Sequence, residues 1–315
     1  MVFLHVVRSP SFPEATPKIV IIPQGYGVAE IARLLGREQI VRYPILFEIL
    51  VLIHRNQTRL QAGEYRLAGA EPPLAVMDKL VRGEVLIHRV TVPEGWTVRQ
   101  IAELLAGEGL VDRERFLRLA SDGPWAARLG LEASSLEGYL FPETYYFHRG
   151  LTAEQIAEKM VATFHSNFTP SDVARARELG MTPHQVVTLA SLIEKETSLP
   201  AERPLVSGVF HNRLSRGMKL QSDPTIIYAL DDFDGNLTDE DLALDSPYNT
   251  YRYAGLPPGP IANPGEAALQ AALYPADCPY LYFVSKNDGS HHFSTNLSEQ
   301  NRAVRRYQKQ PSENE

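Results

Sequence analysis

One pattern occurs twice in the chain, as Pro23-Gln24-Gly25-Tyr26-Gly27-Val28 and, 70 residues later, as Pro93-Glu94-Gly95-Trp96-Thr97-Val98. The first copy leads into Ile31-Ala32-Arg33-Leu34-Leu35 and the second into Ile101-Ala102-Glu103-Leu104-Leu105. Each copy follows an extended, β-branched segment, residues 18–22 and residues 89–92. After the turn, apolar residues recur at positions i, i+3, i+4 and i+7, as on one face of a helix. The repeat therefore predicts a strand, a Pro-x-Gly turn and a short amphipathic helix, twice over.

The residues between the two copies complete a first domain, which we expect to cover residues 18–88. Residues 61–67 have the pattern of a strand, and residues 73–82 that of a helix closed by Gly83. Strand, turn and short helix make up half of a small α/β module. The turn-then-helix pattern resembles the glycan-binding LysM module, whose helix begins in the same way. We therefore expect a LysM-like α/β domain at the N-terminal side of the chain.

The first residues of the chain, Met1–Val7, are apolar and precede a Pro-containing segment, so residues 1–17 are predicted to form a tail or linker. Seven residues are too few for the core of a signal peptide. Two interpretations stay open, a frayed terminus and the last part of a membrane anchor that begins upstream. The second predicts an upstream segment of ~20 apolar residues.

We expect the remainder, residues 89–315, to form a mixed α+β domain, in which residues 89–150 repeat the first strand–turn–helix pattern. Helical periodicity is present over residues 152–164, 171–179, 181–199 and 297–308. Loops rich in Gly, Pro, Asn and Tyr follow residue 199, where ligand sites tend to lie. Strands at 280–284 and 292–295 flank an Asn287-Asp288-Gly289 turn and predict a β-hairpin. The predicted fold class is thus α+β.

Composition excludes several classes of protein. Of the 315 residues, 44% are hydrophobic and 22% charged, which is ordinary for a globular protein and excludes disorder, collagen and coiled coil. The net charge of −7, without a block of Lys or Arg, argues against a nucleic-acid partner. The single cysteine, Cys278, excludes an internal disulfide and a Cys-based zinc site. The longest apolar run, Pro44–Ile53, contains Glu48 and is too short to cross a membrane, so it predicts a buried helix.

The helix predicted at 181–199 carries the best candidates for chemistry. Thr182, Pro183 and Gln185 form a helix start with a capping box. On a helical wheel, Glu194 falls between Val187 and Ala190, whereas Glu196 falls between Leu189 and Leu192, about 160° away. Two carboxylates so far apart cannot serve one cleft, so this helix supplies at most one catalytic carboxylate.

A Glu at the margin of an apolar helix face loses hydration, which raises the pKa of its carboxyl group. Val187 and Ala190 should act on Glu194 in this way. A protonated carboxyl near neutral pH is the state that a general acid needs. The alternative is that both Glu194 and Glu196 pair with arginines such as Arg203 or Arg213. Periodicity alone does not decide between these interpretations.

Further blocks of sequence extend beyond this helix, and their order is informative. The blocks are Glu137-Gly138-Tyr139-Leu140-Phe141-Pro142-Glu143-Thr144-Tyr145, Leu189-Ala190-Ser191-Leu192-Ile193-Glu194-Lys195-Glu196-Thr197, Val209-Phe210-His211-Asn212-Arg213-Leu214, Met218-Lys219-Leu220-Gln221-Ser222-Asp223-Pro224-Thr225, Ser246-Pro247-Tyr248-Asn249-Thr250-Tyr251, Gly255-Leu256-Pro257-Pro258-Gly259-Pro260-Ile261 with Asn263-Pro264-Gly265, and Tyr280-Leu281-Tyr282-Phe283-Val284. In content and order they resemble the endolytic murein transglycosylase family (MltG or YceG-like), over residues 18–307. One departure is Glu299-Gln300-Asn301, where the family often has Glu-His-Asn.

The resemblance implies a lytic transglycosylase that cleaves the β-1,4 bond between N-acetylmuramic acid and N-acetylglucosamine within peptidoglycan strands. Such a reaction leaves a 1,6-anhydromuramoyl end and uses one Glu as acid and then base. The family's catalytic Glu is the first of its Glu-Lys-Glu, which corresponds to Glu194. A hydrolase would ordinarily need two carboxylates. Here the C6 hydroxyl of the substrate is the nucleophile, held at high effective concentration.

The same resemblance implies a place and partners in the cell. We expect the inner (cytoplasmic) membrane, with the catalytic part facing the periplasm or cell exterior, and a role in terminating nascent glycan strands. Peptidoglycan strands are the expected partner, and cell-wall synthesis proteins are further candidates. The family's N-terminal transmembrane helix is not found in this chain. No cofactor and no metal are implied.

Side chains suited to sugar binding occur in two of the loop blocks. Amides, hydroxyls and flat aromatic faces are the groups that recognise sugars. The predicted substrate-binding residues are Gln221, Ser222, Asp223, Tyr248, Asn249 and Tyr251. The alternative for each is a role in turn structure, since Asp-Pro and Ser-Pro commonly begin turns. His291-His292 predicts no metal site, because neighbouring residues of a strand point to opposite faces.

Two other functions remain open from the sequence. In the first, the chain is a non-catalytic peptidoglycan-binding scaffold, and Glu194 is structural. In the second, it is a two-carboxylate glycoside hydrolase that uses Glu194 together with Asp223 or Asp245. The mass of the product distinguishes all three, because an anhydro end is lighter than a hydrolysed end by one water and a scaffold gives no product.

Overall fold

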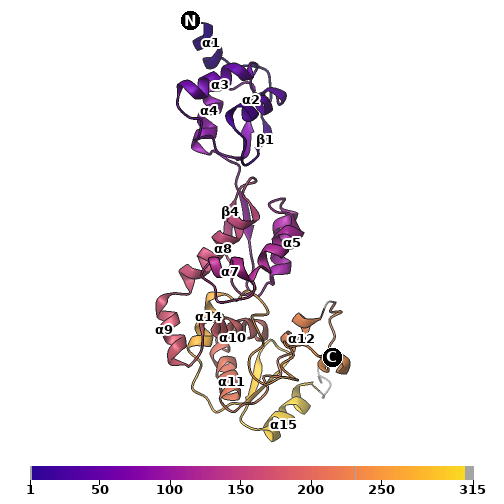
Figure 1. Cartoon of the computed structure of the whole chain (residues 1–315). Helices are drawn as coiled ribbons and strands as arrows, with labels where there is room; N and C mark the ends of the chain where they lie inside the picture. The colour runs from indigo at the N-terminus through magenta and orange to yellow at the C-terminus, as the bar shows by residue number, and fades with distance from the viewer. Residues whose placement is uncertain (1, 231, 309–315) are drawn as a thin grey trace. The chain divides into compact units, whose positions relative to one another are not determined.

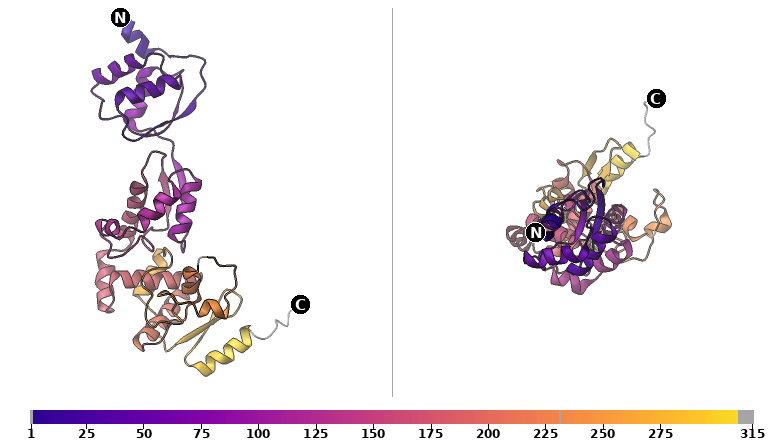
Figure 2. Two further views of the ribbon diagram at one scale, coloured as in Figure 1. Left: turned by 45° about the vertical axis from the view of Figure 1, so that its right-hand side comes forward. Right: turned by 90° about the horizontal axis from the view of Figure 1, so that it is seen from above.

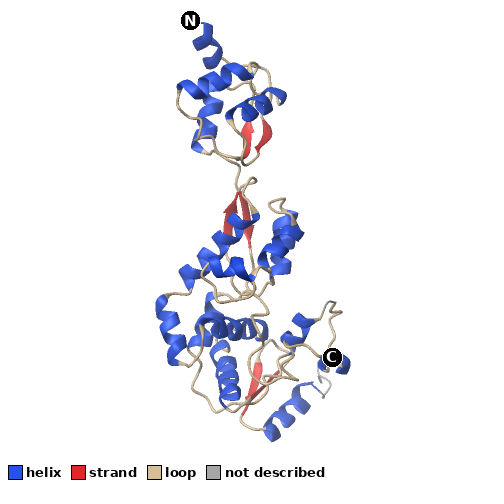
Figure 3. Ribbon diagram, viewed as in Figure 1, coloured by secondary structure: helices blue, strands red, loops and turns tan. Residues whose placement is uncertain are grey.

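The structure, a computed structural model, describes residues 2–230 and 232–308 (Figure 1). The chain divides into two compact units. Unit 1 combines the residues up to Val90 with Glu103–Arg115 and Thr144–Ile156. Unit 2 combines Thr91–Ala102, Phe116–Glu143 and the chain from Ala157 onward. The strands form three two-stranded sheets among many helices, which agrees with the predicted α+β class (Figure 3).

Unit 1 is built on the antiparallel pair β1 (Lys18–Ile22) and β2 (Gly63–Leu67), in a register that places Lys18 opposite Leu67. Burial alternates along β1, where Val20 and Ile22 enter the core and Ile19 and Ile21 face solvent. The helices of this part are α1 (Val2–Arg8), α2 (Val28–Arg37), α3 (Pro44–Ile53) and α4 (Pro73–Arg82). Their buried apolar side chains form one hydrophobic core with those of the two strands.

The predicted repeat is confirmed as a repeat of structure. In the first copy β1 leads through a turn into α2, and in the second β3 (His88–Thr91) leads into α5 (Val98–Gly107). Gly25 and Gly95 hold the same place in the two turns, with positive φ angles of 85° and 74°. Such angles favour glycine, which explains the shared Pro-x-Gly. β3 pairs with β4 (Thr144–Phe147), a strand that the repeat does not predict.

Helix α3 has the predicted bounds, but the prediction that it is buried is only partly right. Its apolar residues surround the whole helix, and only Phe47, Leu50 and Val51 enter the core. The opposite face is exposed to solvent. A helix that is apolar on every side gives no periodic signal that would distinguish its buried face from its exposed one.

Residues 1–17, predicted as a tail or linker, contain a helix, α1. α1 packs against α3 and α4, and Val7 is buried in the core of unit 1. Within residues 2–230 and 232–308, no helix combines the length and the apolar composition needed to cross a membrane.

Unit 2 is mainly helical. Its helices are α6 (Arg113–Ala120), which continues from unit 1, α7 (Gly123–Arg128), α8 (Ala153–Asn167), α9 (Pro170–Glu178), α10 (Pro183–Glu196), α11 (Arg203–Ser215), α12 (Asp223–Ala229), α13 (Asp239–Leu242), α14 (Glu266–Leu273) and α15 (Leu297–Gln308). The predicted C-terminal hairpin is present as β5 (Tyr282–Ser285) and β6 (His291–Ser294), and α15 packs against both strands (Figure 2). α10 contacts α9, α11, α12 and α14 and is the central helix of this unit.

Two predictions for unit 2 need correction. The helix predicted to reach residue 199 ends at Glu196, where Thr197 adopts an extended conformation. The region after residue 199, predicted as loops, contains α11, α12, α13 and α14. These helices begin at Pro, Asp or Gly-containing sequences, and those residues indicate helix starts as readily as turns.

The two faces of α3 provide a stability test within one helix. Replacing the buried Leu50 by Ala should lower the free energy of unfolding of unit 1 by about 2–5 kcal/mol, because a cavity is left in the core. The same change at the exposed Leu52 should stay within about 0.5 kcal/mol. Denaturant unfolding, monitored through hydrogen exchange of the unit 1 amides, measures the free energy of unfolding of both variants. Equal losses at the two positions would contradict the observed orientation of the helix.

Candidate active site

The start of α10 is fixed by its own sequence. The Thr182 hydroxyl accepts from the Gln185 N–H at 3.2 Å, and the Gln185 side chain accepts from the Thr182 N–H at 2.8 Å. This is the predicted capping box, with Pro183 at the first helical position. Every residue from Val186 to Ile193 is buried, so α10 passes through the middle of unit 2. Polar side chains of this helix reach solvent only at its two ends, at His184 and Gln185 and at residues 194–196.

Glu194 is held by donors on both carboxylate oxygens. Arg203 donates from Nη2 to Oε1 at 3.0 Å, and the Gly265 N–H donates to Oε2 at 3.1 Å. The side chain is only 6% exposed, and Glu94 lies 3.6 Å from Arg203 on the other side. The arrangement connects α10 with α11, the turn at residue 94 and the loop at residue 265. It is the arginine pairing that the sequence left open as the alternative.

Burial raises the pKa of Glu194, as the sequence predicts, while the Gly265 N–H and Arg203 act in the opposite direction. The two hydrogen bonds favour the ionised form of Glu194, in opposition to burial. They do not exclude a proton, because each carboxyl oxygen has a second acceptor site. In this arrangement Glu194 pairs with Arg203.

Glu196 occupies a different setting, on the side of α10 that meets α12. Its Oε1 accepts from the Ser222 hydroxyl at 2.5 Å. A hydroxyl can donate to a carboxylate or accept from a carboxylic acid, so this contact allows Glu196 to hold or release a proton. Part of the Glu196 surface remains exposed. The two carboxylates face different neighbours, in agreement with the predicted angle between them.

The surroundings of Glu196 favour its protonated form. Burial raises the pKa of Glu196 to about 7, Ser222 opposes that change, and the negative charge of Asp223 adds to it. Arg213 lowers the pKa by a smaller effect. Glu196 is also the last residue of α10, where the helix dipole disfavours a negative charge. A carboxyl with a pKa near 7 is suited to general acid catalysis.

The turn beside Glu196 is joined to the loop around Thr250. The Gln221 N–H donates to the Thr250 carbonyl at 3.1 Å, and the Ser222 N–H donates to the Thr250 hydroxyl at 3.0 Å. Gln221 has a positive φ of 49°, an uncommon conformation for a residue other than glycine. The structure thus brings together the two segments, 221–223 and 248–251, in which the sequence predicts substrate contacts.

Four of the six predicted substrate-binding residues have side chains that solvent reaches. Gln221 and Asp223 are exposed, and Tyr248 and Tyr251 are partly exposed. The Tyr251 hydroxyl donates to Asp223 Oδ1 at 2.5 Å, so these two side chains form one polar group. Tyr248 lies against Tyr228, with 5.0 Å between the ring centroids. These four residues belong to the two segments that are joined at Ser222, the hydrogen-bond partner of Glu196.

The other two, Ser222 and Asn249, are buried and use their polar atoms within the protein. Ser222 donates to Glu196, as described above. Asn249 donates to the carbonyls of Leu242 and Leu244 and accepts from the N–H groups of Tyr251 and Arg252. The Asn249 amide therefore shapes the loop and is not available to a sugar. Both residues therefore hold the neighbouring segments of the site in position through buried hydrogen bonds.

Two buried residues of the site have contacts that the sequence does not predict, including Arg213, which it offered as a partner for Glu194 or Glu196. Arg213 donates to the carbonyls of Leu281 and Leu220, at 2.6 and 2.7 Å, and so fixes the chain just before Gln221. Glu137 accepts from the Val98 N–H and from Asn263 at 3.1 Å, and burial raises its pKa to about 8. Both belong to blocks singled out in the sequence, but a block does not reveal which member is buried.

The histidines of β6 are engaged elsewhere. His291 Nδ1 lies 2.7 Å from Glu202 Oε2, and its ring packs edge-on to Phe283. Among the described residues, no group of three or more His, Cys, Asp or Glu side chains could hold a metal ion.

Comparison with known proteins places the chain in context. Residues 20–306 match the model of the YceG-like family. A Bacillus subtilis (strain 168) protein named endolytic murein transglycosylase is 34% identical over 302 residues, covering 91% of this chain and 83% of the relative. A Streptococcus pneumoniae (strain D39) protein of the same name is 31% identical over 315 residues, and the chain spans 57% of its length.

A solved structure agrees with these sequence matches. The crystal structure of a yceG-like protein from Listeria monocytogenes has a TM-score of 0.63 and 33% identity. The match covers 91% of this chain and 98% of that one. It extends over both units of the chain. The chain belongs to the YceG-like family, as the ordered blocks of its sequence indicate.

Proposed function

We propose that this protein is an endolytic lytic transglycosylase of peptidoglycan, which cleaves the bond from N-acetylmuramic acid to N-acetylglucosamine and leaves a 1,6-anhydro end. The relatives' names support the substrate and the reaction class. The observation that carries the proposal is the Glu196 carboxyl, whose pKa is raised to about 7 beside Ser222, Asp223 and Tyr251. A single protonated carboxyl next to sugar-binding groups is what this reaction requires.

The geometry favours Glu196 over Glu194 as the general acid. Glu194 is the residue that the family resemblance implies, and its raised pKa keeps that assignment open as a prediction. Its two oxygens, however, face the donors of Arg203 and Gly265. All four solvent-accessible members of the predicted substrate set belong to the two segments that meet beside Glu196. We therefore propose Glu196 as the general acid, to be tested against Glu194, the residue that the family resemblance implies.

The reaction then needs one carboxyl group and no water. Protonated Glu196 gives its proton to the glycosidic oxygen as the bond from that oxygen to C1 of the muramic acid breaks. The C6 hydroxyl of the same sugar forms a bond to C1, and its proton passes to the Glu196 carboxylate. The intramolecular hydroxyl is favoured by its high effective concentration. Positive charge develops at C1 during the step, and we propose that the Asp223 carboxylate, which accepts from Tyr251, stabilises it.

The cellular role is proposed from the family resemblance. The enzyme would act at the outer face of the cytoplasmic membrane and terminate nascent glycan strands, together with cell-wall synthesis proteins. Unit 1 would serve as the LysM-like glycan-binding part, which its strand–turn–helix start supports. Membrane attachment through a segment upstream of Met1 is part of the same proposal.

A pair of isosteric changes on α10 separates the two candidate acids. Glu196→Gln removes the proton donor and should lower turnover of purified peptidoglycan by about 10²–10⁴-fold. Glu194→Gln should keep turnover within about tenfold of the parent, but lower the free energy of unfolding by about 1–3 kcal/mol, because it weakens the pairing of buried Arg203. The opposite pattern, with turnover lost only in Glu194→Gln, would assign the acid to Glu194.

The pKa of Glu196 predicts a pH dependence of both activity and stability. The acid must be protonated before substrate binds, so kcat/KM should fall above about pH 7. The folded-state pKa lies above the ordinary value of 4.5, so ionisation of Glu196 destabilises the fold as pH rises from about 5 to about 7. Glu196→Gln should lack this loss. Unfolding of both proteins at pH 5 and pH 8 gives the comparison, and an identical pH dependence would contradict a raised pKa.

The product decides between a transglycosylase and a hydrolase. Mass spectrometry of digested peptidoglycan should show muropeptides lighter than the hydrolysed product by one water. Asp223 is the neighbouring carboxylate that could support hydrolysis, whereas Asp245 is occupied by Tyr253 and Arg252. Products with a free reducing end would establish the two-carboxylate hydrolase. No product from the folded parent protein would establish the scaffold.

A further inference from the structure

The exposed face of α3 is unusual for a protein surface. Ile45, Ile49, Leu52 and Ile53 are 71%, 38%, 51% and 61% exposed. Their spacing places them together on one side of the helix, opposite the buried side chains of Phe47, Leu50 and Val51. Single exposed apolar residues are common, but a contiguous group marks a surface that is covered in use. We call these four residues the apolar stripe.

Positive charge flanks the helix that carries the stripe. Arg42 precedes α3, and Arg55 and Arg59 follow it, all of them exposed. Glu48 is the only acidic residue within the helix. Residues 1–90 contain 11 Lys and Arg but 8 Asp and Glu, a net charge of +3, whereas the whole chain has a net charge of −7. The positive charge is therefore concentrated in the part of the chain that carries the stripe.

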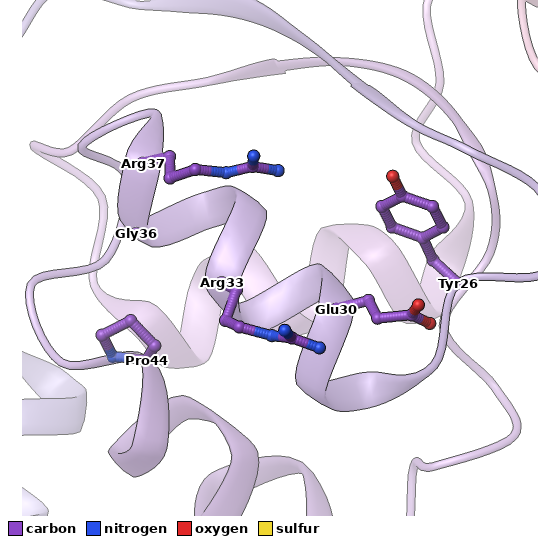
Figure 4. A pocket seen from close by; sticks show the side chains of 6 residues that line it. All are labelled: Tyr26, Glu30, Arg33, Gly36, Arg37 and Pro44. Carbon is purple, nitrogen blue, oxygen red and sulfur yellow. The ribbon is translucent and has the colours of Figure 1, made fainter.

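A groove adjoins the N-terminal end of α3 and adds to this charge. It has a volume of about 580 Å³ and reaches Pro44, the first residue of the helix (Figure 4). Arg33 and Arg37, one turn apart on α2, line it together with Tyr26 and Glu30. Tyr43, which is half exposed, directly precedes Pro44 of the groove and Ile45 of the stripe. Aromatic and basic side chains beside apolar ones are typical of a membrane–water interface.

We propose that the apolar stripe docks on an anionic phospholipid surface, with the side chains of the stripe among the acyl chains and the flanking basic residues at the lipid phosphates. The stripe protrudes from one helix and has cations at both ends, which matches a bilayer surface and its anionic headgroups. Helix α1 packs against α3 and contributes a further exposed apolar side chain, that of Leu4. The contact is peripheral and does not require a spanning segment.

The test measures binding of the full chain to lipid vesicles by co-sedimentation. The parent protein should bind vesicles of equal parts phosphatidylglycerol and phosphatidylcholine more tightly than vesicles of phosphatidylcholine alone, and less tightly as salt rises. The fourfold variant Ile45→Gln, Ile49→Gln, Leu52→Gln, Ile53→Gln should bind the anionic vesicles at least about tenfold more weakly. Binding does not depend on turnover, so this test is independent of the proposed activity.

Matched variants control for folding and for non-specific hydrophobic binding. Ile19→Gln with Ile21→Gln replaces two exposed apolar residues of β1 in the same unit and should leave vesicle binding unchanged. The single changes Ile45→Gln and Ile53→Gln should each weaken binding even if the fourfold variant folds poorly. Arg42→Gln with Arg55→Gln should remove most of the preference for phosphatidylglycerol. Thermal unfolding confirms that each variant is folded.

Several results would overturn the proposal. A parent that binds neither vesicle, or a folded fourfold variant that binds as the parent does, would exclude a lipid contact by the stripe. A parent dimer that dissociates in the fourfold variant, without vesicle binding, would assign the stripe to a second copy of the chain. Loss of binding to purified peptidoglycan with vesicle binding retained would assign it to glycan.

Discussion

The burial of α10 on all sides is the constraint on which unit 2 depends. Eight consecutive residues, Val186–Ile193, are removed from solvent by the helices packed around them. The helix presents polar groups only at its two ends, and its C-terminal end is Glu196. Two carboxylates emerge at that end on different sides, and each meets a different neighbour. Arg203 donates to Glu194, whereas the Ser222 hydroxyl contacts Glu196.

In the proposed function, these different settings let a Glu-Lys-Glu sequence serve a reaction that needs one acid. The Glu194–Arg203 pair joins α10 to α11, and the Gly265 N–H joins the same carboxylate to the loop before α14. A buried pair of this kind positions more than it stabilises, because desolvation offsets much of the attraction. Its effect is to fix the end of α10 and so the place of Glu196. The turn at Ser222, held to Thr250, completes the setting from the other side.

The sequence predicts well those features that have a local cause. The strand–turn–helix repeat, the capping box of α10, the bounds of α3 and the closing hairpin all follow from residues a few positions apart. Features that depend on distant partners are not predictable in this way. A wheel gives the angle between Glu194 and Glu196, but not that Arg203 lies on one side and Ser222 on the other. For the same reason, the burial of Asn249 and the exposed face of α3 required the structure.

The central claim is that Glu196 holds a proton near neutral pH. Titration of the glutamate carboxyl carbons by NMR, with ¹³C-labelled protein, tests it most directly. The account predicts a carboxyl signal that titrates near pH 7, persists in Glu194→Gln and disappears in Glu196→Gln. The Glu137 signal, whose pKa is raised to about 8 by burial, remains in both variants and serves as an internal reference. A Glu196 signal that titrates near its ordinary value of 4.5 would contradict the account.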